Sequence, residues 1–160
     1  VLKSKYRKRK ISFYLNTILA IILISNIYNL IMLHPYQYIY FNSFYEKKAN
    51  KLFEIDYWGL SNKDALKNIV ADNYKGGKIK IGVASFTNLF MSQKMLPDKY
   101  KNKLIITGQN FDNVDFIFNN NYFEINPSYD NKYQIPKNYR NYQQNKKGNV
   151  LINEFYIKEW

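Results

Sequence analysis

The sequence has no cysteine and only one histidine, His34, among its 160 residues. The chain therefore has no disulfide, no thiolate nucleophile and no cysteine-based metal site. One histidine also excludes a histidine-rich metal site, and a Ser–His pair would have to use His34 itself. The few glycines form no G-x-G-x-x-G pattern, and no nucleophile elbow is present. We therefore predict no metal site and no cofactor in this chain, and an independent hydrolase is disfavoured.

Acidic residues are scarce, with 12 Asp and Glu against 24 Lys and Arg, which gives a net charge of +12. Such an excess ordinarily suggests nucleic acid. Six of the positive charges, however, lie within residues 1–10, where no acid occurs. The later lysines alternate with Asp, Glu and Asn, so no basic block is long enough to follow a phosphate backbone. We therefore predict no nucleic-acid partner.

The longest uncharged stretch is Ile11 to Leu33, ISFYLNTILAIILISNIYNLIML. As a helix it would extend about 34 Å, against a hydrocarbon core of about 30 Å. A helix satisfies its own backbone hydrogen bonds where no water is present. A buried core helix is the alternative, but such helices are usually shorter or carry a polar stripe. The stretch predicts one transmembrane helix, with the lipid bilayer as partner.

The flanks of this stretch indicate its orientation. Residues 1–10 are strongly basic, whereas the aromatic segment HPYQYIYFNSFY that follows is nearly neutral. The positive-inside rule then places residue 1 in the cytoplasm and the chain from His34 onward in a periplasmic or extracellular space. A cleavable signal peptide is the alternative, but its apolar region is usually about 7 to 15 residues and ends in small residues. We expect a retained anchor, and Val1 with its basic context suggests the interior of a longer chain.

Residues 34–52 form an aromatic segment just beyond the apolar run. Pro35 is expected to end the helix, because proline lacks an N–H and restricts the residue before it. The clustered Tyr and Phe rings are typical of an interfacial belt. The alternative is that His34, Tyr38 or Asn42 contacts a lipid headgroup or a polyprenyl phosphate.

The remaining residues alternate helical and strand patterns. Ser61 with Asp64 resembles a capping box before a helix over 62–74, and Gly76-Gly77 follows it. Further elements are predicted as a short helix over 88–96, strands over 78–84, 103–107 and 115–119, a loop over 126–136, and a hairpin formed by 139–144 and 150–157.

The predicted fold class is α/β: one N-terminal transmembrane helix followed by a small α/β domain with a mixed sheet and a C-terminal β-hairpin. The predicted divisions are 1–10, a basic cytoplasmic flank; 11–33, the transmembrane helix; 34–52, the interfacial aromatic segment; and 53–160, the extracytoplasmic domain.

Two motifs carry a family resemblance, HPYQYIYFN at 34–42 and FEIDYWGLSNKDAL at 53–66. They resemble polytopic bacterial membrane glycosyltransferases related to the lipid A aminoarabinose and protein mannosyl transferases. In many members the last membrane helix exits into a stretch like HPYQ-x-x-YFN, and a DYWGLS-x-K-[DE]-A pattern opens a small soluble domain. Many members have Gly-Gly after the YFN element, where this chain has Tyr45-Glu46-Lys47.

The resemblance implies transfer of a sugar from a polyprenyl-phosphate donor to an envelope acceptor outside the membrane. The implied catalytic carboxylate belongs to an upstream loop that this chain lacks, so the fragment alone is not expected to be catalytic. The implied partners are the donor, the acceptor and other transmembrane helices of the parent protein. A different class of function is a single-pass, membrane-anchored binding or scaffold module without enzymatic activity.

Asp56, Tyr57 and Trp58 are the candidate sugar-binding residues of the second motif. The carboxylate would bind hydroxyls and the rings would stack on the sugar. The alternative is a structural turn, in which Trp58 packs into the core and Asp56 caps neighbouring backbone N–H groups.

Overall fold

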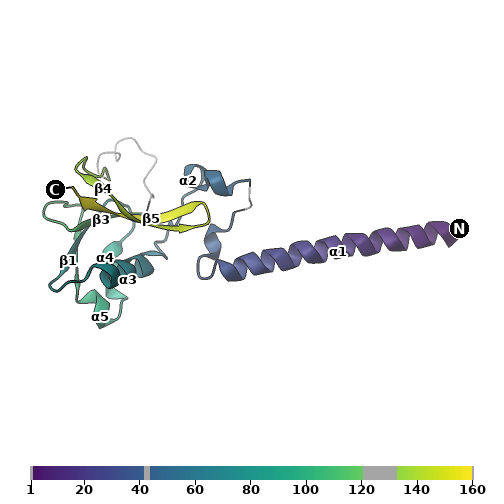
Figure 1. Cartoon of the computed structure of the whole chain (residues 1–160), viewed down its shortest axis with the longest axis horizontal. Helices are drawn as coiled ribbons and strands as arrows, with labels where there is room; N and C mark the ends of the chain where they lie inside the picture. The colour runs from purple at the N-terminus through teal and green to yellow at the C-terminus, as the bar shows by residue number, and fades with distance from the viewer. Residues whose placement is uncertain (1, 42–43, 121–132, 160) are drawn as a thin grey trace. The chain divides into compact units, whose positions relative to one another are not determined.

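The computed structural model describes residues 2–41, 44–120 and 133–159, with side chains from residue 9 onward. The chain divides into two compact units, residues 1–40 and residues 41–160. Most of their helices and strands are labelled in Figure 1.

The first unit consists mainly of α1, Leu2–Met32 (Figure 1). Within it, the stretch Arg9–Met32 is long and apolar enough to cross a membrane, judged by length and composition only. A signal sequence near an N-terminus has the same properties, so membrane insertion stays a prediction. The helix also continues through the basic residues before Ile11, because nothing in that segment interrupts a helical backbone.

The end of α1 lies where Pro35 was expected to place it. After Met32 the chain forms a turn and then a short 3₁₀ helix, η1, Gln37–Ile39. The Tyr40 hydroxyl donates to Asn26 Oδ1 at 2.6 Å and so links this turn to the last part of α1.

The second unit contains a five-stranded sheet with strand order β2-β1-β3-β5-β4. Strand β1 runs parallel to both of its neighbours, β2 and β3, whereas β5 is antiparallel to β3 and to β4. The last two strands form the C-terminal hairpin (Figure 1). The predicted mixed sheet is therefore confirmed. The strands are β1 Ile79–Val83, β2 Leu104–Gly108, β3 Phe116–Asn119, β4 Tyr139–Lys147 and β5 Val150–Lys158.

One face of the sheet packs against α3, Asn62–Asn73, with α4, Leu89–Lys94, and α5, Asp98–Lys101, beside it. Helical spacing places the apolar side chains of α3 on one side, where they meet alternate residues of the strands. This core cluster includes Leu66, Ile69, Ile81, Phe118 and Phe155.

The other face of the sheet is covered at β1 by the connection between β2 and β3. Val114 and Phe111 of this connection pack with Ala84 and Ile117. A Cβ on Gly82 would lie 2.7 Å from Cδ1 of Phe111, so glycine is needed for the connection to approach the strand this closely.

Residues 44–52, assigned from the sequence to the interfacial segment, lie in the same compact unit as the sheet. They form η2, Glu46–Lys48, and α2, Ala49–Leu52. The Asn50 side chain donates to Leu151 O at 2.5 Å and accepts from Leu151 N at 2.9 Å, so it pairs with β5 as a neighbouring strand would. Contact of these residues with a membrane stays a prediction.

The predicted helices over 62–74 and 88–96 are confirmed within a residue or two at each end, as are the strands other than the first strand of the hairpin. The first hairpin strand extends to Lys147, beyond the predicted 144. The predicted capping box is wrong, because the Ser61 side chain makes no cap hydrogen bond and its hydroxyl bonds to Asp56 instead. Of the predicted loop over 126–136, residues 126–132 lie outside the described residues.

Two leucines that are near each other in the sequence but differ in burial allow a matched test of the α3 packing. Leu66 is fully buried, whereas Leu60 is 61% exposed. We expect Leu66→Ala to lower the free energy of unfolding by about 2–5 kcal/mol, because it leaves a cavity in the core. Leu60→Ala should change it by less than about 0.5 kcal/mol. Denaturant unfolding of the full chain in detergent, followed by circular dichroism, measures both; equal effects would contradict the packing described.

Candidate functional site

The candidate site lies at the carboxyl ends of β1 and β3, where α/β folds commonly bind ligands. Three segments meet there: the loop 56–61 before α3, the residues 84–87 after β1, and Asn120 after β3. Hydrogen bonds connect these segments. Asn62, the residue after the loop, donates from Nδ2 to Thr87 Oγ1 at 3.3 Å, and Asn120 Nδ2 donates to Asp56 O at 3.3 Å.

The loop 56–61 is a tight turn with two residues in the left-handed region. Asp56 has φ of 56° and Gly59 has φ of 63°. Gly59 N donates to Asp56 O at 2.8 Å, and Asn62 N donates to Gly59 O at 3.1 Å. A Cβ at Gly59 would lie 2.5 Å from Asn62 Nδ2, so both the φ angle and the close approach require glycine.

The Asp56 carboxylate is buried at 2% exposure and bonds to the start of α3. Ser61 donates both its N–H, at 3.3 Å to Oδ2, and its hydroxyl to Asp56. The same hydroxyl oxygen accepts from Asn153 Nδ2 of β5 at 2.6 Å. This chain of hydrogen bonds, called the loop anchor below, connects Asp56, Ser61 and Asn153. It confirms the expectation that Asp56 caps neighbouring backbone N–H groups.

Trp58 points away from the loop anchor and is 81% exposed, while Tyr57 is 41% exposed. Their ring centroids lie 4.8 Å apart at an interplanar angle of 79°, an edge-to-face pair. The expectation that Trp58 packs into the core is therefore wrong. The left-handed turn at Asp56 directs that carboxylate inward and leaves the indole two residues later on the outside.

A second polar group lies beside the loop anchor at the end of β1. Ser85 Oγ and Thr87 Oγ1 are 2.9 Å apart, and Thr87 N donates to Ser85 Oγ at 3.1 Å. Asn62, only 1% exposed, reaches this pair through Thr87. These bonds fix the segment that leads from β1 into α4.

The other candidate residues belong to the first unit or lie outside the described residues. His34 Nδ1 and Gln37 Nε2 are 2.9 Å apart. Tyr38 is 39% exposed and makes an edge-to-face contact with Tyr36, with ring centroids 6.2 Å apart. Asn42 is outside the described residues. The structure thus brings Asp56, Tyr57 and Trp58 together on one loop, and its two-unit division does not place His34 or Tyr38 against them.

Sequence reasoning missed Asn120, Asn153 and Glu154, all of which are buried. The signal was present in the strand sequence VLINEFYI, where two adjacent polar residues interrupt an apolar run. Since buried polar groups are nearly always hydrogen-bonded, such an interruption indicates partners elsewhere in the fold.

Glu154 has neutral hydrogen-bond donors from both strands of the hairpin. Asn141 Nδ2 donates at 2.7 Å and Gln144 Nε2 at 3.1 Å to Oε2, while the Tyr156 hydroxyl donates at 2.7 Å to Oε1. Burial, together with the hydrogen bond to Glu154 and the charge of Glu154, raises the pKa of Tyr156 to about 12. These hydrogen bonds connect side chains of β4 to side chains of β5.

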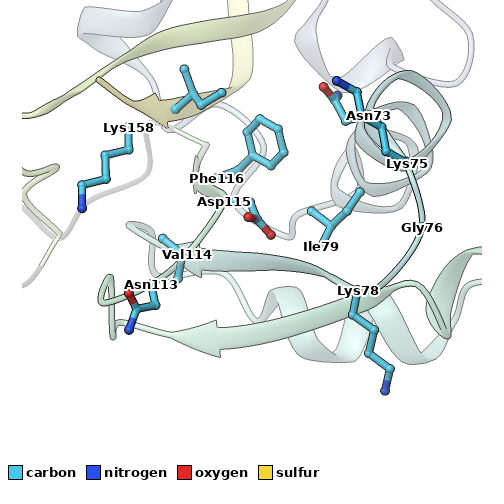
Figure 2. A pocket seen from close by; sticks show the side chains of 11 residues that line it. Asn73, Lys75, Gly76, Lys78, Ile79, Asn113, Val114, Asp115, Phe116 and Lys158 are labelled. Carbon is cyan, nitrogen blue, oxygen red and sulfur yellow. The ribbon is translucent and has the colours of Figure 1, made fainter. Parts of the chain in front are cut away.

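A cavity of about 560 Å³ lies at the opposite end of the strands, near the start of β1 and β3 (Figure 2). The one carboxylate among its lining residues is that of Asp115. It accepts a hydrogen bond from Lys80 N at 2.7 Å and is therefore already paired with the backbone. Figure 2 shows the Lys78 and Lys158 side chains extending away from Phe116 and Asp115. Because Lys78 and Lys158 extend away from Asp115, and the Asp115 carboxylate already accepts from a backbone N–H, the cavity is a weaker candidate than the loop 56–61. The described residues also contain no cluster of His, Cys, Asp or Glu that fits a metal ion.

Comparison with protein-family models, curated proteins and solved structures finds no match to this chain.

Removing one member of the loop anchor should destabilise the second unit. Asn153→Ala deletes the donor to Ser61 Oγ inside a buried network, and we expect a loss of about 1–3 kcal/mol in the free energy of unfolding. Asn149→Ala, in the exposed hairpin turn, makes the same chemical change and should have little effect. Denaturant unfolding measures the difference, and equal stability of the two variants would contradict a structural role for the anchor.

The raised pKa of Tyr156 predicts a loss of stability at high pH. The phenol is neutral in both states below its ordinary pKa of about 10. As pH rises from there to about 12, it ionises in the unfolded chain before the folded one, so the free energy of unfolding falls. Tyr156→Phe should show a shallower fall over this window than the parent chain. Tyr142→Phe, on the same hairpin, is the control, and parallel curves for all three proteins would refute the prediction.

Proposed function

We propose that the chain is the C-terminal membrane helix and outer α/β domain of a membrane glycosyltransferase. The enzyme would transfer a sugar from a polyprenyl-phosphate donor to an envelope acceptor, with its catalytic carboxylate upstream of this chain. In this proposal α1 crosses the bilayer with residues 1–10 in the cytoplasm, and residues 41–160 lie outside. Support comes from the two sequence motifs and from an α/β domain that follows a helix able to span a membrane.

The observation that carries the proposal is the exposed Trp58 on a loop whose backbone is held in place. The loop anchor and the Gly59 turn restrain residues 56–61 through buried hydrogen bonds. An indole that is 81% exposed on such a loop leaves its apolar face open to a ligand. Sugar rings present flat C–H faces that pack on aromatic rings, and a rigid aromatic residue loses little conformational entropy on binding.

The chemistry available at this loop is binding and orientation. Trp58 offers a ring face, and Tyr57 offers a second ring with a hydroxyl. The Asp56 carboxylate is occupied by Ser61, so its role is to position the loop. The domain would then hold an acceptor glycan near the membrane while residues elsewhere in the enzyme perform the transfer.

The second candidate is a membrane-anchored binding or scaffold module without enzymatic activity. It is favoured by the absence, within the loop 56–61 as described, of an exposed carboxylate or histidine. Both candidates use the same aromatic surface, and they differ in whether sugar transfer accompanies binding.

The experiment introduces Trp58→Ala at the native locus and measures sugar transfer from a polyprenyl-phosphate donor in membranes. We expect transfer at low acceptor concentration to fall by about two- to tenfold, the range expected for one lost aromatic contact. Trp58→Tyr keeps a ring face and should restore most of the activity.

The mass of the native membrane product and the amount of each variant serve as controls. Normal transfer by Trp58→Ala at equal abundance would contradict an acceptor role for the loop. A native product of about 19.2 kDa with no transfer activity would overturn the glycosyltransferase proposal and leave the scaffold module.

A further inference from the structure

The outer face of α4 is unusually apolar. Phe90, Met91 and Met95 are 49%, 51% and 61% exposed, whereas Leu89, Ser92 and Leu96 on the inner face are buried. Surface helices normally present polar residues on their outer face. Three neighbouring large apolar side chains on a six-residue helix and its C-cap therefore need an explanation.

The helix is held in this orientation and cannot simply rotate to bury these residues. Asn88 Oδ1 accepts from Met91 N at 3.1 Å and fixes the start of α4. Gln93 Nε2 donates to Lys101 O at 3.0 Å and to Leu104 O at 2.9 Å, which fixes its end against α5 and β2. Leu89 and Leu96 are part of the core cluster.

The segment that carries this apolar face is rich in lysine. Residues 84–103 contain four lysines and one acid, Asp98. That acid pairs with Lys101 at 2.7 Å, and the pairing lowers its pKa. Two of the lysines lie over aromatic rings, with Lys94 Nζ 4.6 Å from the centroid of Phe90 and Lys103 Nζ 4.0 Å from that of Tyr74.

Apolar side chains bordered by lysines are typical of surfaces that rest on an anionic bilayer. The apolar groups enter the boundary between headgroups and acyl chains, and the lysine stems allow their ammonium groups to reach phosphates. A protein partner would satisfy the apolar groups equally well, but the charge excess fits lipid phosphates better.

We propose that the outer face of α4, comprising Phe90, Met91, Lys94 and Met95, docks on the surface of an anionic lipid bilayer. The inference rests on the membrane placement of α1 in the proposed function, since a membrane-anchored domain meets the bilayer at a high effective concentration. This contact would hold the domain against the membrane and limit the range of positions open to Trp58.

The test uses the full chain in vesicles, and the absence of cysteine allows single labelling sites. A polarity-sensitive fluorophore is attached at Met91→Cys or, as control, at Asn149→Cys in the exposed hairpin turn. The vesicles contain phosphatidylcholine alone or with phosphatidylglycerol, each with and without a lipid-bound quencher. We expect a blue shift and quenching at position 91 in the anionic vesicles, and neither change at position 149.

A charge-reversal pair tests the lysines. Lys94→Glu with Lys99→Glu should lower the bilayer-bound fraction reported at position 91 by about fivefold or more for each lysine replaced. Lys137→Glu with Lys146→Glu makes the same change in net charge at exposed positions elsewhere and should leave the signal unchanged.

Resistance of the vesicle-bound chain to alkaline extraction reports insertion of α1 separately. An inserted chain whose label at position 91 stays unquenched and solvent-exposed would overturn docking while leaving the proposed function intact. A shielded but unquenched label would also overturn docking, because a protein surface would then cover α4.

Equal quenching in neutral and anionic vesicles would refute the role of the lysines. Loss of the chain on extraction would instead overturn the membrane placement on which both proposals rest.

Discussion

A hydrogen-bonded chain of three buried side chains, Asp56, Ser61 and Asn153, joins parts of the second unit that are far apart in the sequence. It connects the loop before α3 to the last strand of the sheet. Buried polar groups of this kind are costly when a partner is missing, so the pairing constrains the loop to one arrangement. The exposure of Trp58, the placement of the start of α3 and the contact with Asn120 all depend on it.

The two faces of the sheet are covered by different kinds of contact. On one face the apolar sides of α3 and α4 supply a continuous core of aliphatic and aromatic side chains. On the other, the short connection that contains Phe111 and Val114 crosses Gly82, and Glu154 collects donors from the hairpin. Trp58 and the outer face of α4 are among the apolar groups that remain exposed, and both lie on segments fixed by this packing. They are therefore surfaces available to ligands, and local movement cannot bury them.

Much of the fold could be predicted because the signals are local. The spacing of Ala65, Leu66, Ile69 and Val70 specifies a helix face, and alternation at Ile79, Ile81 and Val83 specifies a strand. Both patterns survive in the structure since every one of these residues is buried. The capping box failed for a physical reason. Ser61 has the right residue type for an N-cap, but the Asp56 carboxylate competes for its hydroxyl, and a pattern of neighbouring residues does not reveal which partner is preferred.

By itself, the sequence determined the apolar helix, the order of helices and strands in an α/β domain, and the absence of cysteine chemistry. These follow from composition and periodicity, which act over a few residues. Only the tertiary structure decided that Asp56 is buried while Trp58 is exposed, and that Asn153 supports a loop more than ninety residues earlier in the chain. Such pairings depend on how distant segments meet, because a buried hydrogen bond is specified by geometry and leaves only a weak trace in the residues beside it.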